Sequence, residues 1–255
     1  REHAMCGIMN GLALHSGLIP YGGTFLIFSD YCKPSIRLSA IMKQRVIYIM
    51  THDSIGLGED GPTHQPIEQL SGLRSIPNLN VFRPADTMET YECWQLALEN
   101  LNSPSVLALT RQKLNPVRKE FLNKNQCSFG AYEVSRSNKD IELTIMASGS
   151  EVNLAAEISH KLATENIYSK VISVPCQEIF EQQPDSYKNK ILNEGNFTIT
   201  IEAGTTVCWH KYIVKKGLNF GIEDFGKSAP YKEIYNFFGL TADNIVEKTK
   251  NLIRG

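Results

Sequence analysis

The sequence predicts an α/β protein of two domains, each with a mainly parallel sheet flanked by helices. Short apolar runs such as Val46–Met50 and Ser105–Leu109 have the composition of fully buried parallel strands. Segments with helical spacing alternate with these runs along the 255 residues, a length sufficient for two ordinary domains. We therefore expect a first domain over residues 1–113, a linker over 114–129 and a second domain over 130–255.

The first domain is expected to open with a helix of small residues that ends near Leu14. An extended aromatic segment follows, and Gly22-Gly23 is expected to form the turn that leads into it. Asp30 is a plausible N-cap for a helix that runs to about Gln44, because its carboxylate can accept a hydrogen bond from a free amide of the first turn. The next elements are the strand over 46–50, a helix over 67–73, a strand over 78–82, a helix over 88–100 and the strand over 105–109.

The second domain repeats the alternation after a stretch that has no apolar periodicity. Its predicted strands cover 142–147, 169–174 and 198–202, and its predicted helices cover 151–165, 231–238 and 242–252. The Ser148-Gly149-Ser150 turn between the first strand and helix could bind an anion at the helix N-terminus. Because it lacks a full GxGxxG pattern or a P-loop lysine, side-chain capping of the helix is the simpler interpretation.

Composition argues against several classes of protein. The formal net charge of −1 gives no electrostatic reason to expect nucleic acid or an anionic membrane as a partner. No apolar run approaches the roughly 18 to 20 residues that span a bilayer, and the opening REHAMCGIMNG has no apolar core of a secretory signal. The six cysteines show no metal-binding spacing, so each is expected to be a small buried residue in a reducing compartment. We therefore expect a cytoplasmic protein.

The most informative stretch is the loop Thr51–Pro66, which reads THDSIGLGEDGPTHQP. It leaves the end of a predicted buried strand, where open α/β sheets place their ligands. Three glycines and Pro62 oppose regular structure, and His52, His64 and three acids lie in the same segment. An ordinary strand-to-helix connection is the alternative, but such a connection does not need so many titratable groups.

Other candidate residues lie outside this loop. Glu2 is next to small and apolar residues, where a desolvated carboxylate could share a proton with a basic ring nitrogen; a solvated acid near the chain end is the alternative. Phe25, Phe28 and Tyr31 recur at intervals of three residues, which indicates either core packing or an aromatic wall for a flat heterocycle. Arg111 follows a buried strand and could be a fork for an anion or half of a structural ion pair.

Two histidines and an acid in the loop suggest contacts to a polar substrate. His52, His64 and Asp60 suit hydrogen bonding to a polyhydroxylated molecule and proton transfer near neutral pH. The histidines could also be metal ligands, but their spacing matches no usual zinc pattern, and we assign no metal site in this chain.

The chain resembles transketolase in the string GLGEDGPTHQP preceded by THDSI, with an upstream REHAM, a TFLIFSDY segment and a downstream LTRQ. The second half adds ASGSEV, IEAG and FGKSAP, which are similar to the C-terminal domain of that family. The resemblance covers nearly the whole chain. The DGPTH core alone is also similar to 1-deoxyxylulose-5-phosphate synthase, but the longer string and LTRQ favour transketolase, with dihydroxyacetone synthase as a close cousin.

The resemblance implies thiamine diphosphate as cofactor and assigns residues to its pyrimidine ring. Glu2 matches the catalytic glutamate that hydrogen-bonds the aminopyrimidine ring nitrogen and so promotes loss of the proton from the thiazolium carbon. Phe25, Phe28 and Tyr31 match the aromatic pocket for the pyrimidine, with Phe28 stacked on its face. The cofactor carries the carbanion chemistry, and the protein orients and polarises the cofactor and the substrate.

The resemblance also implies sugar phosphates as substrates. The reaction is reversible transfer of a two-carbon ketol unit from a ketose phosphate of the xylulose 5-phosphate type to an aldose phosphate of the ribose 5-phosphate type, in the pentose phosphate pathway. His64 matches a catalytic histidine at the carbonyl and hydroxyl end of the donor, and Asp60 matches the acid that reads a sugar hydroxyl. His52 and Arg111 match groups that hold the sugar phosphate.

The sequence departs from the family in one respect. A full transketolase binds the diphosphate and a Mg²⁺ or Ca²⁺ ion through a GDG-containing motif in a preceding domain, and no GDG occurs here. We therefore expect a pyrimidine-binding domain that lacks its first strand, plus the C-terminal domain, with the metal ligands in a domain that is missing. Such a chain is expected to be inactive alone and to act as a homodimer or with a separate N-terminal transketolase chain. An enzyme like 1-deoxyxylulose-5-phosphate synthase and a non-catalytic assembly module with the same fold are the alternatives.

Overall fold

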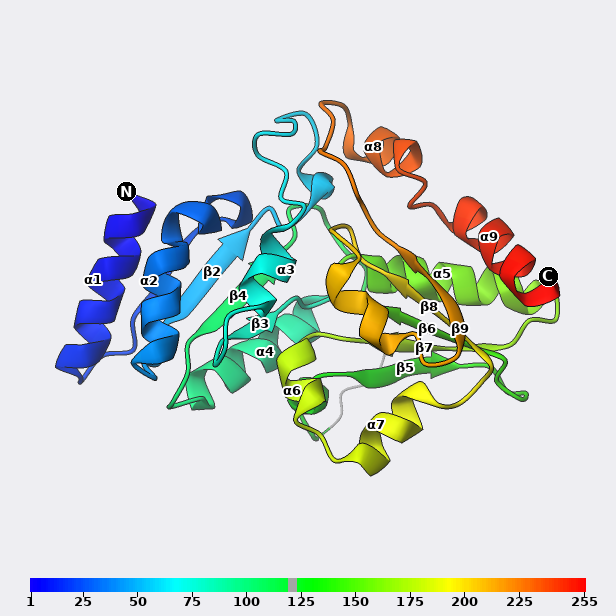
Figure 1. The fold of residues 1–255 in the computed structure, drawn as a ribbon, viewed down its shortest axis with the longest axis horizontal. Helices are drawn as coiled ribbons and strands as arrows, with labels where there is room; N and C mark the ends of the chain where they lie inside the picture. The colour runs from blue at the N-terminus through cyan, green and yellow to red at the C-terminus, as the bar shows by residue number, and fades with distance from the viewer. Residues whose placement is uncertain (119–122) are drawn as a thin grey trace.

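The computed structural model describes residues 1–118 and 123–255 and contains two sheets whose strands are mainly parallel (Figure 1). This confirms the α/β class and the two mainly parallel sheets expected from the sequence. The first sheet has the strand order β1-β2-β4-β3, and all its neighbours run parallel. Its strands are β1 (Tyr21–Phe25), β2 (Ile47–Thr51), β3 (Asn80–Phe82) and β4 (Ser105–Leu109).

Helices cover both faces of the first sheet because its central strands are apolar on both sides. Tyr48 and Met50 on β2 face a core formed with α1, α2 and α3, while Ile47 faces the core formed with α4. This is why β2 reads as a continuous apolar run. The helices are α1 (Glu2–His15), α2 (Ser29–Ile41), α3 (Gln69–Arg74) and α4 (Thr87–Glu99), with short 3-10 turns η1 (Leu26–Phe28) and η2 (Ile55–Leu57).

The second sheet has the order β5-β7-β6-β8-β9, and β5 is antiparallel to β7 whereas the other neighbours are parallel. Its strands are β5 (Tyr132–Arg136), β6 (Leu143–Ala147), β7 (Ser169–Ser173), β8 (Phe197–Ile201) and β9 (Lys216–Phe220). Two of the cores of the molecule lie on its opposite faces, one with α5 and α9 and the other with α6, α7 and η4. These elements and α8 have the bounds α5 (Glu151–Thr164), α6 (Gln177–Glu181), α7 (Asp185–Leu192), η4 (Val207–Tyr212), α8 (Tyr231–Phe237) and α9 (Ala242–Arg254).

Two expectations for the first half are wrong. Gly22 and Gly23 form no turn but lie within β1, where a Cβ on Gly22 would come 2.8 Å from the Met9 sulfur, so glycine there lets α1 approach the strand. Asp30 is not the N-cap of α2, because η1 leads directly into the helix and Phe28 occupies the cap position. The Asp30 carboxylate instead accepts a hydrogen bond from Gln69 Nε2 at 3.0 Å.

The side chains of the turn between β6 and α5 do not cap the helix N-terminus. Ser150 makes no side-chain cap bond, and Ser148 accepts hydrogen bonds from the Arg83 guanidinium through its carbonyl (2.8 Å) and Oγ (3.1 Å). Gly149 has φ +55, and a Cβ there would lie 2.7 Å from Arg83 Cζ. Glycine is therefore needed because a cation packs against the turn. The side-chain capping expected from the sequence is wrong, and anion binding at this turn stays a prediction.

The predicted linker is partly structured and partly outside the described residues. Residues 119–122 fall outside, but the 3-10 turn η3 (Gln126–Phe129) is anchored because the Gln126 and Cys127 amides both donate to Glu92 Oε2 at 3.0 Å. The domain boundaries themselves stay a prediction. Five of the six cysteines are buried, Cys208 is half-buried, and all are free thiols. Among the described residues, no helix combines the length and apolar character required to cross a bilayer.

Candidate active site

Three aromatic rings predicted to form a wall lie in a row at the end of β1. Phe25 ends β1, Phe28 ends η1 and Tyr31 is in the first turn of α2. The Phe25 and Phe28 rings have centroids 5.9 Å apart and an interplanar angle of 12°, and the Phe28 and Tyr31 rings are also 5.9 Å apart at 21°. Because the rings are nearly parallel and Tyr31 is exposed, the row presents flat apolar surface to a ligand.

His52 lies against this row. Its imidazole stacks on Phe25 with centroids 3.7 Å apart, and its Nδ1 is 2.9 Å from Thr51 Oγ1. Burial lowers the pKa of His52, and the nearby Arg111 cation lowers it further, although Asp60 and Asp53 oppose this. The backbone of His52 has φ +58, a left-handed conformation that is unfavourable for most side chains.

His64 approaches the same aromatic row from the far end of the glycine-rich loop. Its ring meets Phe28 edge-on with centroids 5.7 Å apart, and its Nδ1 is 3.0 Å from Thr63 Oγ1. In the described part of the chain, no residue bonds to Nε2 of either His52 or His64. Asp60 and Arg111 have exposed side chains near His52, and no ion pair forms between Arg111 and any described residue.

Glu2 lies in the first turn of α1, which packs against α2 beneath the aromatic row. Its charge acts on the buried thiols of Cys6 and Cys32, so it is close to the core between the two helices. The Glu2 side chain is nevertheless 30% exposed. The apolar enclosure expected for this carboxylate is therefore incomplete within the described residues.

The structure thus brings Phe25, Phe28, Tyr31, His52 and His64 together by direct ring contacts. The charges of Arg111 and Asp60 act on His52, so both side chains lie near it. Glu2 lies near α2, but the structure records no contact between Glu2 and these rings. All of them come from the carboxyl ends of β1, β2 and β4 or from α1 and α2. In the ranges 1–118 and 123–255, no cluster of three or more His, Cys, Asp or Glu side chains could hold a metal ion.

A buried ion network that the sequence did not reveal lies beneath the loop and joins the two sheets. Arg83 follows β3 and is fully buried; its Nε donates to Asp53 Oδ2 at 2.8 Å and its Nη1 to Glu151 Oε2 at 2.5 Å. Arg74 donates to both oxygens of Glu202, at 2.7 and 2.8 Å. Trp209 Nε1 also donates to Glu202, at 2.9 Å. Because Asp53 follows His52 directly, this network fixes the start of the loop.

Electrostatics act in opposite directions on two acids of this network. Burial alone would raise the pKa of Glu202, but the charges and hydrogen bonds of Arg74 and Arg83 outweigh it and lower that pKa to about 2. Burial raises the pKa of Asp53, which the Arg83 charge only partly offsets. Only the positions of these residues in the sequence could have indicated the network. Asp53, Arg83 and Glu202 each follow or end a predicted strand, so complementary charges meet where the carboxyl ends of the two mainly parallel sheets converge.

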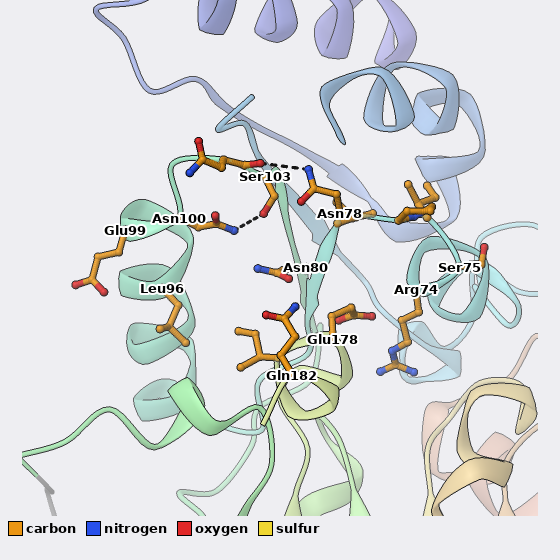
Figure 2. Close-up of a pocket in the computed structure, with 15 residues that line it drawn as sticks. Arg74, Ser75, Asn78, Asn80, Leu96, Glu99, Asn100, Ser103, Glu178 and Gln182 are labelled. Atoms are coloured by element: carbon orange, nitrogen blue, oxygen red, sulfur yellow. Dashed lines mark hydrogen bonds between the residues drawn. The ribbon is translucent and has the colours of Figure 1, made fainter. Parts of the chain in front are cut away.

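Figure 2 shows a different pocket, a cavity of about 610 Å³ between α3, α4 and α6. Asn80 begins β3 and Ser103 shortly precedes β4, so this cavity lies at the amino ends of the strands. The side chains of Asn80 and Gln182 point into it (Figure 2). None of the candidate residues lines it, and open α/β sheets place their ligands at the opposite, carboxyl ends.

Comparison with known proteins identifies the family of both halves of the chain. Residues 1–116 match the family model for the transketolase pyrimidine binding domain, and residues 130–241 match the model for the transketolase-like C-terminal domain. A transketolase of Sinorhizobium medicae is 51% identical over 255 residues, which is 100% of this chain and 36% of that protein. The chain belongs to the transketolase family.

Solved transketolases share the fold closely. The transketolase from Leishmania mexicana superposes with a TM-score of 0.93 at 44% identity, covering 100% of this chain and 37% of that one. A structure described as a split gene transketolase, an inactive beta4 tetramer, has the same fold with a TM-score of 0.83 at 22% identity, covering 100% of this chain and 82% of that one. The chain therefore spans little more than a third of the length of the full transketolases it matches, 36% in the curated relative above.

Proposed function

We propose that this chain forms the pyrimidine-binding and C-terminal part of a cytoplasmic transketolase of the pentose phosphate pathway. In the complete enzyme it would take part in the reversible transfer of a two-carbon ketol unit from a ketose phosphate to an aldose phosphate, of the xylulose 5-phosphate and ribose 5-phosphate types. The observation that supports this best is the meeting of His52 and His64 with Phe25 and Phe28 at the carboxyl edge of a parallel sheet. Family membership then favours ketol transfer over other chemistry at such a cleft.

The aromatic row fits the pyrimidine ring of thiamine diphosphate. Phe28 is half-buried and Tyr31 is exposed, and their nearly parallel rings leave flat surface on which a heterocycle can stack. Phe25 would support the site from behind, since His52 covers one of its faces. Glu2 would hold the ring nitrogen through a shared proton. When bound, thiamine diphosphate supplies the carbanion chemistry of ketol transfer.

The histidines, Asp60 and Arg111 would hold and orient the sugar. The lowered pKa of His52 keeps its ring neutral at neutral pH, so that it can donate or accept a hydrogen bond with the sugar phosphate. Arg111 offers an exposed guanidinium that can bind phosphate in a bidentate manner. His64 would bond the carbonyl and hydroxyl end of the donor and move a proton there, while Asp60 would read a sugar hydroxyl.

The diphosphate and a Mg²⁺ or Ca²⁺ ion would be held by a diphosphate-binding domain in another part of the assembly. A partner is also suggested by apolar side chains on the outer surface of α1 and α2, where Ile8, Leu38 and Ile41 are 64%, 50% and 58% exposed. A second copy of this chain or a separate N-terminal transketolase chain would cover them. One solved structure of the same fold is described as a split gene transketolase, an inactive beta4 tetramer.

A single reconstitution tests the proposal. The chain is mixed with thiamine diphosphate and Mg²⁺, with and without a transketolase diphosphate-binding chain, and turnover of xylulose 5-phosphate with ribose 5-phosphate is measured. Turnover that requires the second chain is the expected result. Consumption of pyruvate and glyceraldehyde 3-phosphate without ketol transfer would instead indicate an enzyme like 1-deoxyxylulose-5-phosphate synthase. No turnover in either mixture would favour a non-catalytic assembly module.

A further inference from the structure

A short segment from the second half of the chain is bonded to the glycine-rich loop. Ser228 Oγ donates a hydrogen bond to the carbonyl of Glu59. Gln65 Nε2 donates to the carbonyl of Gly58 at 2.7 Å and to that of Lys227 at 2.9 Å, so one amide near the end of the loop binds both the middle of the loop and the segment. In Figure 1 the loop after β2 and the chain leading into α8 lie side by side, in agreement with these bonds.

The two surfaces are also complementary in shape. A Cβ on Gly226 would lie 1.7 Å from Gln65 Oε1, so only glycine leaves room for the buried amide. Gln65 is 1% exposed. On the opposite side, Gly61 has φ +80, and a Cβ there would come 3.2 Å from Ser228 Cβ. Glycine is therefore needed on both sides of this contact.

The bonded positions flank the two residues that face the sugar. Asp60 lies between Glu59 and Gly61, and His64 directly precedes Gln65. The side chain of Asp60 is exposed, and none of the described residues hydrogen-bonds to it. Its direction is therefore set by the loop backbone alone, which internal turn bonds and the Ser228 and Gln65 contacts hold.

The segment is itself anchored to the buried network. It leads into α8, where Tyr235 Oη donates to Glu151 Oε1 at 2.8 Å. The other oxygen of Glu151 binds Arg83, which in turn binds Asp53 beside His52. The second half of the chain thus holds the loop near its start through Asp53, at its middle through Ser228 and near its far end through Gln65.

We infer that Ser228 and Gln65 are positioning residues, through which residues 226–229 orient Asp60 and His64 toward the donor sugar. This inference rests on the proposed function and extends it: the C-terminal domain takes part in substrate selection. The consequence is specific, because a misplaced Asp60 weakens recognition of one sugar hydroxyl without affecting a donor that lacks that hydroxyl.

The first test compares two donors in the complete assembly. Ser228→Ala removes the bond beside Asp60 and leaves the Gln65 bonds beside His64. It is expected to raise KM for xylulose 5-phosphate about fivefold, the effect of losing one hydrogen bond, with kcat for hydroxypyruvate, which lacks the hydroxyl assigned to Asp60, unchanged. Ser228→Thr keeps the hydroxyl and is expected to restore the wild-type KM for xylulose 5-phosphate. In an Asp60→Ala background, Ser228→Ala should have no further effect on the ratio of kcat/KM for xylulose 5-phosphate to that for hydroxypyruvate. An equal loss of kcat/KM with both donors in Ser228→Ala would overturn the inference.

The second test needs no turnover and separates this inference from the proposed function. In the chain itself, Ser228→Ala is expected to accelerate amide hydrogen exchange across residues 58–65 and to leave residues 25–31 unchanged. Ser75→Ala is the matched control, because the exposed Ser75 also donates to a backbone carbonyl, that of Gly72, away from the loop. Unchanged exchange at residues 58–65 would overturn the inference even in an active enzyme. Faster exchange in an assembly without ketol transfer would contradict the proposed function alone.

Discussion

The imidazole of His52 stacks on the ring of Phe25 with their centroids 3.7 Å apart, and the His52 backbone is left-handed, with φ +58. A strained backbone persists only where surrounding contacts enforce it. Here the contacts are the aromatic ring on one side and the Asp53–Arg83 ion pair on the other. The conformation of His52 is therefore set jointly by the end of β1 and by the buried network.

The stability of the chain should depend on pH through His52. Burial, and then Arg111, places its pKa in the folded chain below the usual 6.5. The unfolded chain therefore binds more protons between these two values, and the contribution of neutral His52 to stability is full above about pH 6.5 and falls as the pH decreases toward the folded pKa. His52→Asn tolerates a positive φ and cannot titrate, so it should flatten this slope.

The measurement for His52 is urea unfolding at several pH values from about 5 to 7.5. His15→Asn is the control for the loss of an exposed histidine elsewhere in the chain. A slope that His52→Asn leaves unchanged would show that His52 is not held neutral.

Arg83→Met should strongly destabilise the chain. It leaves Asp53 and Glu151 buried without their cation, and removing one partner of a buried ion pair costs about 3–5 kcal/mol. Arg136→Met is the matched control: Arg136 also pairs with two carboxylates, but it is 44% exposed, so its loss should cost less than about 1 kcal/mol. Denaturant unfolding of both variants tests the difference, and similar costs would contradict a structural role for the network.

The strands that the sequence predicted well are those buried on both faces. β2 and β4 contribute side chains to cores on either side of the sheet, so their sequences are continuous apolar runs. β5 and β9 were missed because they are the edge strands of the second sheet, and Phe220 is the only buried residue of β9. An edge strand of this kind carries too few apolar residues to stand out from a loop.

The candidate site was predictable where its residues are close in sequence and not where they are distant. The loop from Thr51 to Pro66 contains both histidines and Asp60 within one segment, so its composition was informative. The ion pair between Arg83 and Glu151 joins residues 68 positions apart, and the contact between Ser228 and Glu59 joins residues 169 apart. No local pattern indicates such pairs, because they depend on how the two sheets meet.

Glu2→Ala in the completed enzyme should slow removal of the proton from the thiazolium carbon of the cofactor by about 100-fold or more, the range expected for loss of a general acid-base group. Because the Glu2 side chain is 30% exposed, folding should be nearly unaffected. Hydrogen–deuterium exchange at that carbon measures the effect directly. His3→Ala is the control, since His3 is exposed in the same turn of α1, and a Glu2→Ala enzyme with normal exchange would show that the assignment of Glu2 is wrong.

Two glycine-to-alanine substitutions should have opposite effects. Gly7 is exposed within α1, and a Cβ there meets nothing within 4 Å, so Gly7→Ala should stabilise the chain by about 0.5–1 kcal/mol through a lower entropy of the unfolded state. In Gly226→Ala the new Cβ would collide with the Gln65 amide, and moving that amide breaks its bonds to Gly58 and Lys227. The expected cost is about 1–3 kcal/mol, because buried groups lose their partners. Thermal unfolding measures both changes, and a Gly226→Ala chain as stable as the wild type would show that the contact between residues 226–229 and the loop is loose enough to move aside, so that it could not orient Asp60 or His64.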